Sequence, residues 1–190
     1  MSGTPASDED IVALVRRGDV ERFGELMERY EPKLRRYGAR FLARTDDISD
    51  LVQDIFVQTY QHLQNFDSSL RFSPWIYRIA HNAFVNELRR KSRRPLILPD
   101  FDIVLSHTQS TESAEGASEH HMLERMVEKG LSQVPEKFRE ILILYFMEGL
   151  SYKEISDVLR IPVGTVGVRL TRAKKALRAV YKAQNMTYEQ

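Results

Sequence analysis

The sequence contains no cysteine, and this absence removes several kinds of chemistry at once. Without a thiol the chain forms no disulfide, uses no cysteine nucleophile, senses no redox change through cysteine and holds no zinc through thiolates. The lack of cysteine also fits a reducing compartment. The fold must therefore be stabilised by packed hydrophobic cores and not by disulfides or zinc–thiolate sites.

Long apolar runs are absent too. No stretch approaches the roughly 20 consecutive apolar residues that a membrane-spanning helix needs. The N-terminus carries Asp8, Glu9 and Asp10 instead of the basic start of a signal peptide. We therefore expect a cytoplasmic protein with no membrane insertion.

Motifs for catalysis and cofactor binding are missing as well. The chain has no glycine-rich phosphate-binding loop and no nucleophile beside a base at a useful spacing. His120 and His121 stand beside Glu119, but neighbouring residues on a helix face different directions and no His-Glu-x-x-His pattern is present. We expect no catalytic residue, metal site, cofactor or small-molecule substrate, and hence no enzyme.

The charge that is present is sorted by sign along the chain. The net charge of +1, from 28 Lys and Arg against 27 Asp and Glu, says little about partners. The segment 46–67 holds five acids and neither Lys nor Arg, whereas 71–94 holds seven bases and one acid. A third segment, 160–182, holds seven bases and no acid. We expect the acidic segment to bind a protein and the basic segments to bind nucleic acid.

Apolar residues recur at helical spacing over most of the chain, which predicts an all-α fold. The exception is 95–118, where prolines, serines and threonines occur without a sustained period. From Pro95 to Glu128 there are seven acids and one Arg. We therefore expect two small helical domains, 1–94 and 119–190, joined by a flexible acidic linker at 95–118.

Local signals predict where several helices begin and end. Ser7 and Asp10 form a capping box for a short first helix. Pro32 lies inside a long helical pattern, 19–42, so we expect a kink or a break there. The serine and proline at 73–74 are typical of a helix start.

The basic helix after that start carries most of the aromatic side chains of its segment. Its expected buried residues are Trp75, Ile76, Ile79, Ala83 and Leu88. Trp75 and Phe84 are expected in the core. Phe66, Phe72 and Tyr77 lie nearer the preceding loop, where they are candidates for stacking on unpaired bases.

The last forty residues predict a helix-turn-helix arrangement. Ser151 and Glu154 form a capping box for its first helix, and 160–162 is a tight turn before a final helix, 163–182, with outward bases. Outward residues near the start of that helix can reach base edges. A stand-alone helix-turn-helix regulator is the alternative, but it would leave the acidic and basic helices without a task and would normally dimerise.

Four motifs together resemble one known family. They are Asp-Leu-Val-Gln-Asp-Ile-Phe at 50–56, Phe-Ser-Pro-Trp-Ile-Tyr-Arg-Ile-Ala-His-Asn at 72–82, Leu-Ser-Tyr-Lys-Glu-Ile at 150–155 and Ile-Pro-Val-Gly-Thr-Val at 161–166. In order and spacing they resemble bacterial sigma factors of the extracytoplasmic-function (ECF) group, which belong to the sigma-70 family. The resemblance covers nearly the whole chain, from about Asp19 to Tyr181.

The resemblance implies a two-domain initiation factor that binds core RNA polymerase and promoter DNA, with an anti-sigma factor as a further partner. It implies that the clamp helices of the largest polymerase subunit are bound by Asp47, Asp50, Gln53, Asp54 and Gln58. It implies that the melted minus-ten strand is bound by Asn65, Ser68, Ser69, Arg71, Phe72, Arg78, Asn82, Asn86, Arg89 and Arg90.

The same resemblance implies that the minus-thirty-five duplex is read by the final helix, through Gly164, Thr165, Gly167, Val168, Arg169, Thr171, Arg172 and Lys175. The acidic linker would follow the RNA exit path. Gly167 and Val168 depart from the family pattern, in which Lys or Arg is followed by Ser at these positions. The minus-thirty-five sequence therefore cannot be carried over from relatives.

Overall fold

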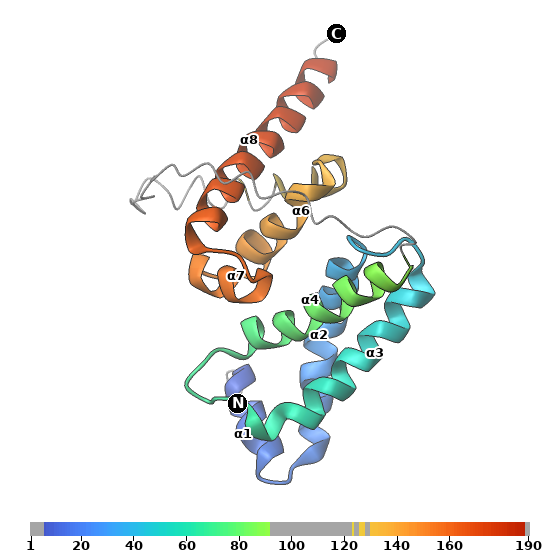
Figure 1. Cartoon of the computed structure of the whole chain (residues 1–190), viewed down its shortest axis with the longest axis vertical. Helices are drawn as coiled ribbons and strands as arrows, with labels where there is room; N and C mark the ends of the chain where they lie inside the picture. Colours follow the sequence, from blue (N-terminus) through green and yellow to red (C-terminus); the bar gives the residue numbers. More distant parts are fainter. Residues whose placement is uncertain (1–5, 92–122, 124–125, 128–129, 189–190) are drawn as a thin grey trace, which may run out of the picture. The chain divides into compact units, whose positions relative to one another are not determined.

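The computed structural model describes residues 6–91, 123, 126, 127 and 130–188. Every regular element within those residues is helical, as the sequence predicts (Figure 1). The chain divides into two compact units, Met1–Leu96 and Ile97–Gln190. The expected linker, 95–118, and the histidines at 120 and 121 lie outside the described residues.

Four α-helices build the first unit: α1 (Asp8–Arg16), α2 (Phe23–Gly38), α3 (Thr45–His62) and α4 (Phe72–Lys91). Short 3-10 turns, η1 (Val20–Arg22) and η2 (Leu63–Asn65), precede α2 and follow α3. α3 packs along both α2 and α4, while α1 packs on α2 and α4 (Figure 1). The core of this unit is therefore shared by all four helices.

The core of the first unit is apolar and rich in aromatic rings. Its fully buried side chains include Ile11, Leu26, Tyr30, Leu34, Tyr37, Ile55, Phe72, Ile76, Tyr77 and Phe84. Each large apolar side chain that is fully removed from water contributes about 1.5–3 kcal/mol. Along α3, Ile48, Val52 and Ile55 are buried together.

α2 runs through Pro32 without interruption, so the break expected there is wrong. Tyr30 and Leu34, on either side of the proline, are both buried. Their packing keeps the helix intact although Pro32 cannot donate an amide hydrogen bond to the preceding turn. Met27, which belongs to the same apolar pattern, is 39% exposed.

α4 begins at Phe72 rather than at 73–74, and its buried face agrees with the predicted one at Ile76 and Phe84 only. Its buried residues are Phe72, Ile76, Tyr77, Ala80 and Phe84. The predicted Trp75, Ile79, Ala83 and Leu88 are only half-buried. Apolar residues occur on two sides of this helix, so their spacing alone does not decide which side meets α2 and α3.

The second unit is built around one long helix. Its described elements are η3 (Leu131–Gln133), α6 (Glu136–Leu142), a π-helical turn η4 (Ile143–Met147), α7 (Tyr152–Leu159) and α8 (Val163–Tyr188). α8 packs against α6 and α7. It continues to Tyr188, beyond the expected end near Lys182.

The described residues contain neither a candidate membrane-spanning helix nor a candidate metal cluster. None of the helices there is both long and apolar enough to cross a membrane. Over the same residues, no three His, Asp or Glu side chains gather in a way that could hold a metal ion.

Candidate protein and nucleic-acid interfaces

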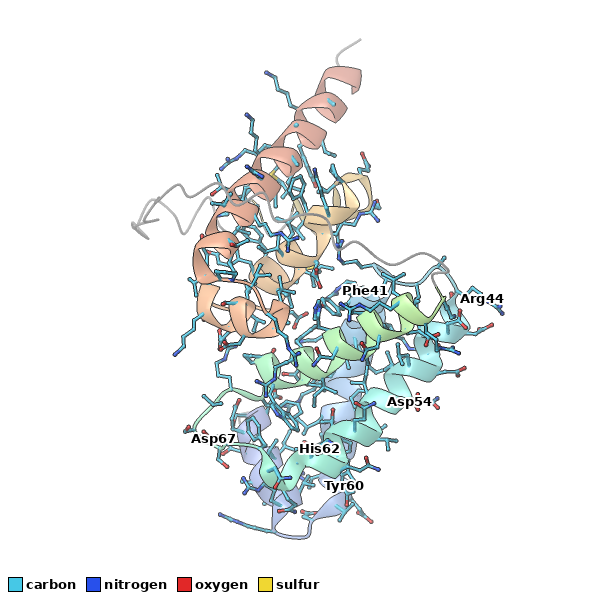
Figure 2. The ribbon with its side chains drawn as sticks, in the orientation of Figure 1. Phe41, Arg44, Asp54, Tyr60, His62 and Asp67 are labelled. Carbon is cyan, nitrogen blue, oxygen red and sulfur yellow. The ribbon has the colours of Figure 1, made fainter. Side chains whose placement is uncertain are left out.

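One side of α3 is exposed and acidic. This acidic face consists of Asp46, Asp50, Gln53, Asp54, Val57 and Gln58. Figure 2 shows Asp54 on the outer side of α3. Val57, near the C-terminal end of the face, is 54% exposed, so the face offers an apolar contact beside its carboxylates and amides. Such a mixture suits a protein partner better than a polyanion.

Asp47 differs from the other predicted acids because it is used within the chain. Its carboxylate pairs with Lys91 at the end of α4 and lies 4.0 Å from Arg44. Lys91 also lies 3.5 Å from Glu87. Asp47 therefore joins the start of α3 to the end of α4. Because these ion pairs partly neutralise it, its charge is less available to an outside partner than the charges of Asp50 and Asp54.

The loop 66–71, between η2 and α4, is ordered by its own hydrogen bonds. The Asp67 carboxylate accepts hydrogen bonds from the Ser69 amide at 3.0 Å and the Ser69 hydroxyl at 2.8 Å. The Leu70 amide donates to the Asp67 carbonyl at 3.0 Å. The amide and then the hydroxyl of Ser69 lower the pKa of Asp67 below its ordinary value, so the carboxylate that builds the turn is ionised at neutral pH.

The predicted minus-ten residues of this loop and of the turn before it are exposed. Asn65 closes η2, and Ser68, Ser69 and Arg71 lie at the surface of the loop. Leu70, beside them, is 58% exposed. The loop and the turn before it therefore place two hydroxyls, an amide and a guanidinium at the surface.

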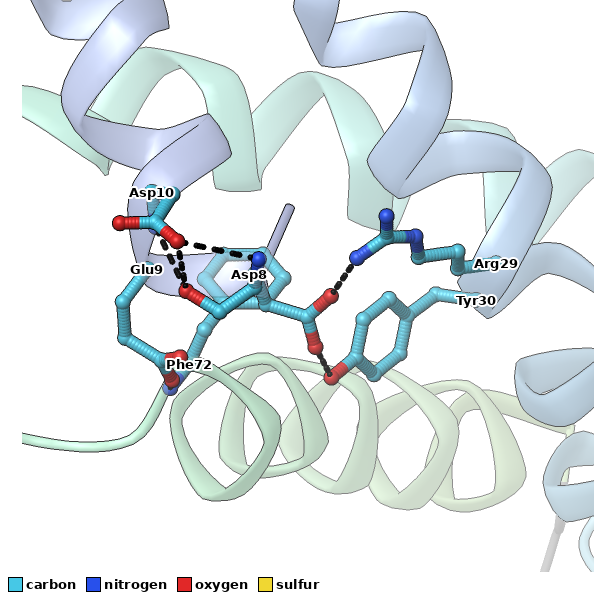
Figure 3. A network of polar contacts seen from close by, with 7 residues as sticks. Asp8, Glu9, Asp10, Arg29, Tyr30 and Phe72 are labelled. Carbon is cyan, nitrogen blue, oxygen red and sulfur yellow. Dashed lines mark hydrogen bonds and ion pairs between the residues drawn. The ribbon is translucent and has the colours of Figure 1, made fainter. Parts of the chain in front are cut away.

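α1 holds this loop at both ends. Nη1 of Arg16 donates to the Ser68 hydroxyl at 2.7 Å and to the Phe66 carbonyl at 3.2 Å. At the other end, the amide of Phe72 donates to the Glu9 carboxylate at 2.8 Å (Figure 3). Because the first amides of a helix lack partners within it, Glu9 supplies the cap that α4 needs.

The three acids at the start of α1 have three separate tasks (Figure 3). Asp8 accepts from Arg29 at 2.7 Å and from the Tyr30 hydroxyl at 2.6 Å. Asp10 completes the predicted capping box with Ser7, which is confirmed. With Glu9 bound to α4, the acidic start of the chain fixes α1 to both α2 and α4.

The aromatic residues near the loop are buried, which corrects their expected role. Phe72 and Tyr77 are 0% exposed and Phe66 is 3% exposed. The Phe72 ring contacts Tyr30 at 5.4 Å and Phe66 at 6.0 Å between centroids, so in this conformation it supports the loop from below and cannot stack on a base. Trp75, expected in the core, is instead half-buried beside Phe66 and Phe72.

The outer side of α4 carries the remaining predicted minus-ten residues. Arg78, Asn86, Arg89 and Arg90 are exposed and Asn82 is half-buried. Arg90 makes two hydrogen bonds to Glu87, at 2.7 and 2.8 Å, and these bonds lower the pKa of Glu87. Arg90 is therefore partly neutralised, whereas Arg78 and Arg89 give this side its positive charge.

The helix-turn-helix geometry predicted for the second unit is confirmed. Ser151 and Glu154 form both halves of the capping box that starts α7. Arg160 ends α7 with a φ of 54°, a left-handed conformation that an arginine rarely adopts. The Ser156 hydroxyl donates to the Ile161 carbonyl at 2.6 Å and fixes the turn before α8.

The first turns of α8 carry mostly small side chains. Among its predicted contact residues, Gly164, Thr171, Arg172 and Lys175 are exposed, and Thr165, Gly167, Val168 and Arg169 are half-buried. The Thr171 hydroxyl donates to the Gly167 carbonyl at 2.9 Å. Both glycines have room for a side chain, since a Cβ at Gly164 would meet nothing within 4 Å and one at Gly167 would lie 3.6 Å from Tyr152.

Comparison with known proteins accounts for this pair of units. Residues 26–94 match the model of Sigma-70 region 2, and residues 104–177 match the model of Sigma-70, region 4. The RNA polymerase sigma-H factor of Pseudomonas aeruginosa is 34% identical over an alignment of 183 residues, and the alignment covers 92% of this chain and 93% of that protein. The chain belongs to the sigma-70 family.

Further relatives place this sigma factor in the ECF group. The ECF RNA polymerase sigma factor SigW of Bacillus subtilis is 30% identical, over 86% of this chain and 91% of that protein. The structure of CnrH in complex with the cytosolic domain of CnrY superposes with a TM-score of 0.61 and 26% identity, over 94% of this chain and 99% of that one. As an ECF sigma factor, the chain directs promoter-specific initiation of transcription.

The region 2 match begins at residue 26, so α1 lies outside it. The contacts of Glu9 and Arg16 to the loop were also missed by sequence reasoning. No local spacing reveals them, because their partners lie 63 and 52 residues away along the chain. Only the packing of α1 onto α4 brings the groups together.

Proposed function

We propose that this ECF sigma factor divides its work between three surfaces. The acidic face of α3 binds core RNA polymerase. The loop 66–71 and the basic side of α4 bind the unwound minus-ten strand, and the start of α8 binds the minus-thirty-five duplex. Domains 1–94 and 119–190, with a linker at 95–118, carry these tasks.

The observation that carries this proposal is the separation of charge on exposed surfaces. The acidic face presents Asp46, Asp50 and Asp54 and no base. The outer side of α4 presents Arg78 and Arg89. Because phosphates repel the first surface and attract the second, one partner cannot occupy both.

Within each nucleic-acid surface the residues differ in what they can read. In the loop, hydroxyls and an amide are suited to base edges, whereas the arginines of α4 are suited to phosphates. On α8, Arg172 is exposed within reach of a major groove that an α-helix can enter. Val168 offers an apolar contact to a thymine methyl.

Two further features belong to the same proposal. The structural neighbour CnrH was solved in complex with the cytosolic domain of CnrY, which supports a second protein partner for the present chain besides core polymerase, and we propose that this partner is an anti-sigma factor. The chain acts in the cytoplasm, where core polymerase and promoters are found, and it acts as an initiation factor without catalysis of its own.

A transcription assay with purified components tests the proposal. Core polymerase, the full chain and a library of promoter fragments are combined, and RNA start sites are mapped. The proposal requires RNA synthesis that depends on both the chain and a particular upstream sequence. Synthesis that is the same without the chain would refute it.

A further inference from the structure

The loop 66–71 contains two neighbouring serines whose hydroxyl groups are engaged in opposite ways. Arg16 can only donate, so its 2.7 Å hydrogen bond makes the Ser68 oxygen an acceptor. The Asp67 carboxylate can only accept, so the 2.8 Å bond uses the proton of the Ser69 hydroxyl. Ser68 therefore keeps its proton for an outside acceptor, and Ser69 keeps lone pairs for an outside donor.

This arrangement suits one class of ligand. An unpaired base carries hydrogen-bond donors and acceptors side by side on its Watson–Crick edge. Both serines are exposed, as is Asp67 between η2 and α4. A loop whose donor and acceptor are already set loses less conformational entropy when it captures a base than a loop that must reorganise.

The groups that set the loop lie on α1. Arg16 fixes Ser68 and also binds the Phe66 carbonyl at 3.2 Å, where the loop begins. Glu9 fixes the amide of Phe72 at 2.8 Å, where the loop ends. The buried rings of Phe66 and Phe72 pack against each other beneath the loop and support it.

We propose that Arg16 and Glu9 are positioning residues that preset the loop 66–71, with Ser68 as donor and Ser69 as acceptor, for capture of one unpaired base. This inference rests on the proposed role of the loop at melted promoter DNA. It extends that role to α1, which lies outside the matched region 2 segment. Arg16 and Glu9 act through the loop and need not touch the base.

The test uses the full chain bound to core polymerase and a fluorescent single-stranded oligonucleotide with the minus-ten sequence found in the transcription assay. Arg16→Ala is compared with Arg17→Ala, which removes the same charge from the next position, where the side chain is exposed. We expect Arg16→Ala to weaken strand binding about tenfold and Arg17→Ala to change it less than about twofold. Equal losses in the two variants would overturn the inference.

Three further readouts separate positioning from simple loss of structure. Affinity for core polymerase and the unfolding temperature should stay near wild type in Arg16→Ala, because the hydrogen bonds of Arg16 go to Phe66 and Ser68 and not to the acidic face. Ser68→Ala should weaken strand binding, and adding Arg16→Ala to it should cost less than Arg16→Ala costs alone, because both substitutions remove the Arg16–Ser68 hydrogen bond. Fully additive losses, or a loss of polymerase affinity that matches the loss of strand binding, would contradict the inference.

Glu9 is tested by rescue. Glu9→Ala removes the cap of α4 and should weaken strand binding, whereas Glu9→Gln keeps an oxygen that accepts from the Phe72 amide and should restore most of it. No rescue would contradict the role of the hydrogen bond. If the wild-type holoenzyme did not bind the oligonucleotide, the proposed function would be refuted. If the wild type bound it and the Arg16→Ala variant bound it equally well, only the present inference would be refuted.

Discussion

Gly38 near the end of α2 faces the ring of Phe84 on α4 so closely that a Cβ added to the glycine would lie 2.6 Å from Cε1 of that ring. Phe84 is fully buried, and its ring stacks on Phe41 at 5.6 Å between centroids. The ring therefore has little room to retreat. The close approach of α2 and α4 depends on the missing side chain.

Gly38→Ala is predicted to destabilise the first unit by about 1–3 kcal/mol, because it overfills a packed contact. Gly24→Ala is the matched control in the same helix, since a Cβ there would meet nothing within 4 Å. The control should be neutral or slightly stabilising because alanine favours helix. Denaturant unfolding measures the free energy of unfolding of both variants. Equal stability of the two variants would show that the Phe84 ring shifts to accommodate the added methyl group.

Asp50→Lys with Asp54→Lys is predicted to weaken binding to core polymerase by about 10- to 100-fold, because it reverses the charge at the centre of the acidic face. The helical content should be unchanged, since both side chains are exposed. Glu21→Lys with Glu28→Lys changes the net charge equally at exposed positions elsewhere. If both double variants lost the same affinity in a binding titration, the acidic face would have no special role.

Arg172→Ala is predicted to weaken binding to a minus-thirty-five duplex by about 1–3 kcal/mol and to relax the preference at one base pair. Lys182→Ala, exposed farther along α8, should weaken binding uniformly across sequences or leave it unchanged. Selection of bound duplexes from a random pool reads both effects. If Arg172→Ala weakened binding equally for all duplex sequences, the result would indicate that Arg172 contacts a phosphate and not a base.

The first unit is predicted to lose stability in acid. Hydrogen bonds from the Ser7 hydroxyl and then the Ser7 amide lower the pKa of Asp10, and Ser69 lowers the pKa of Asp67, both from an ordinary value of 3.8. Arg90 lowers the pKa of Glu87 from 4.5. These carboxylates bind protons more weakly in the folded chain, so their stabilisation is present above those ordinary values and is lost as pH falls through the lowered ones.

Asp10→Asn checks the acid effect at one position. The variant should melt below wild type at pH 6, and the gap should narrow as pH falls toward 3, because the wild-type carboxyl is then protonated. Asp19→Asn serves as the control, since Asp19 makes no side-chain hydrogen bond at its helix start. A gap that stays constant with pH would contradict the contribution of the ionised Asp10.

Local signals predicted much of this fold. Ser7 with Asp10 and Ser151 with Glu154 form capping boxes that depend on groups three residues apart. The helical spacing of apolar residues also predicted α3, which buries Ile48, Val52 and Ile55 on one side. The exposed acids of α3 could be read in the same way, although no local pattern revealed that Lys91 would pair with Asp47.

The rest of the fold depends on contacts between distant residues. α4 has apolar side chains on two sides, and the choice between them is made by the packing of Phe72 and Phe84 against α2. That choice buries the aromatic rings that were expected to stack on DNA. The hydrogen bonds between α1 and the loop likewise join residues more than fifty positions apart, so no local pattern in the sequence predicts them.

The account rests on one surface that binds polymerase and others that bind DNA, and a pair of binding titrations tests this division most directly. The full chain is titrated with core polymerase in the absence of DNA, and separately with promoter duplex in the absence of polymerase. The account predicts tight, saturable binding to polymerase and weak, salt-sensitive binding to duplex. Tight duplex binding together with no detectable binding to polymerase would contradict it.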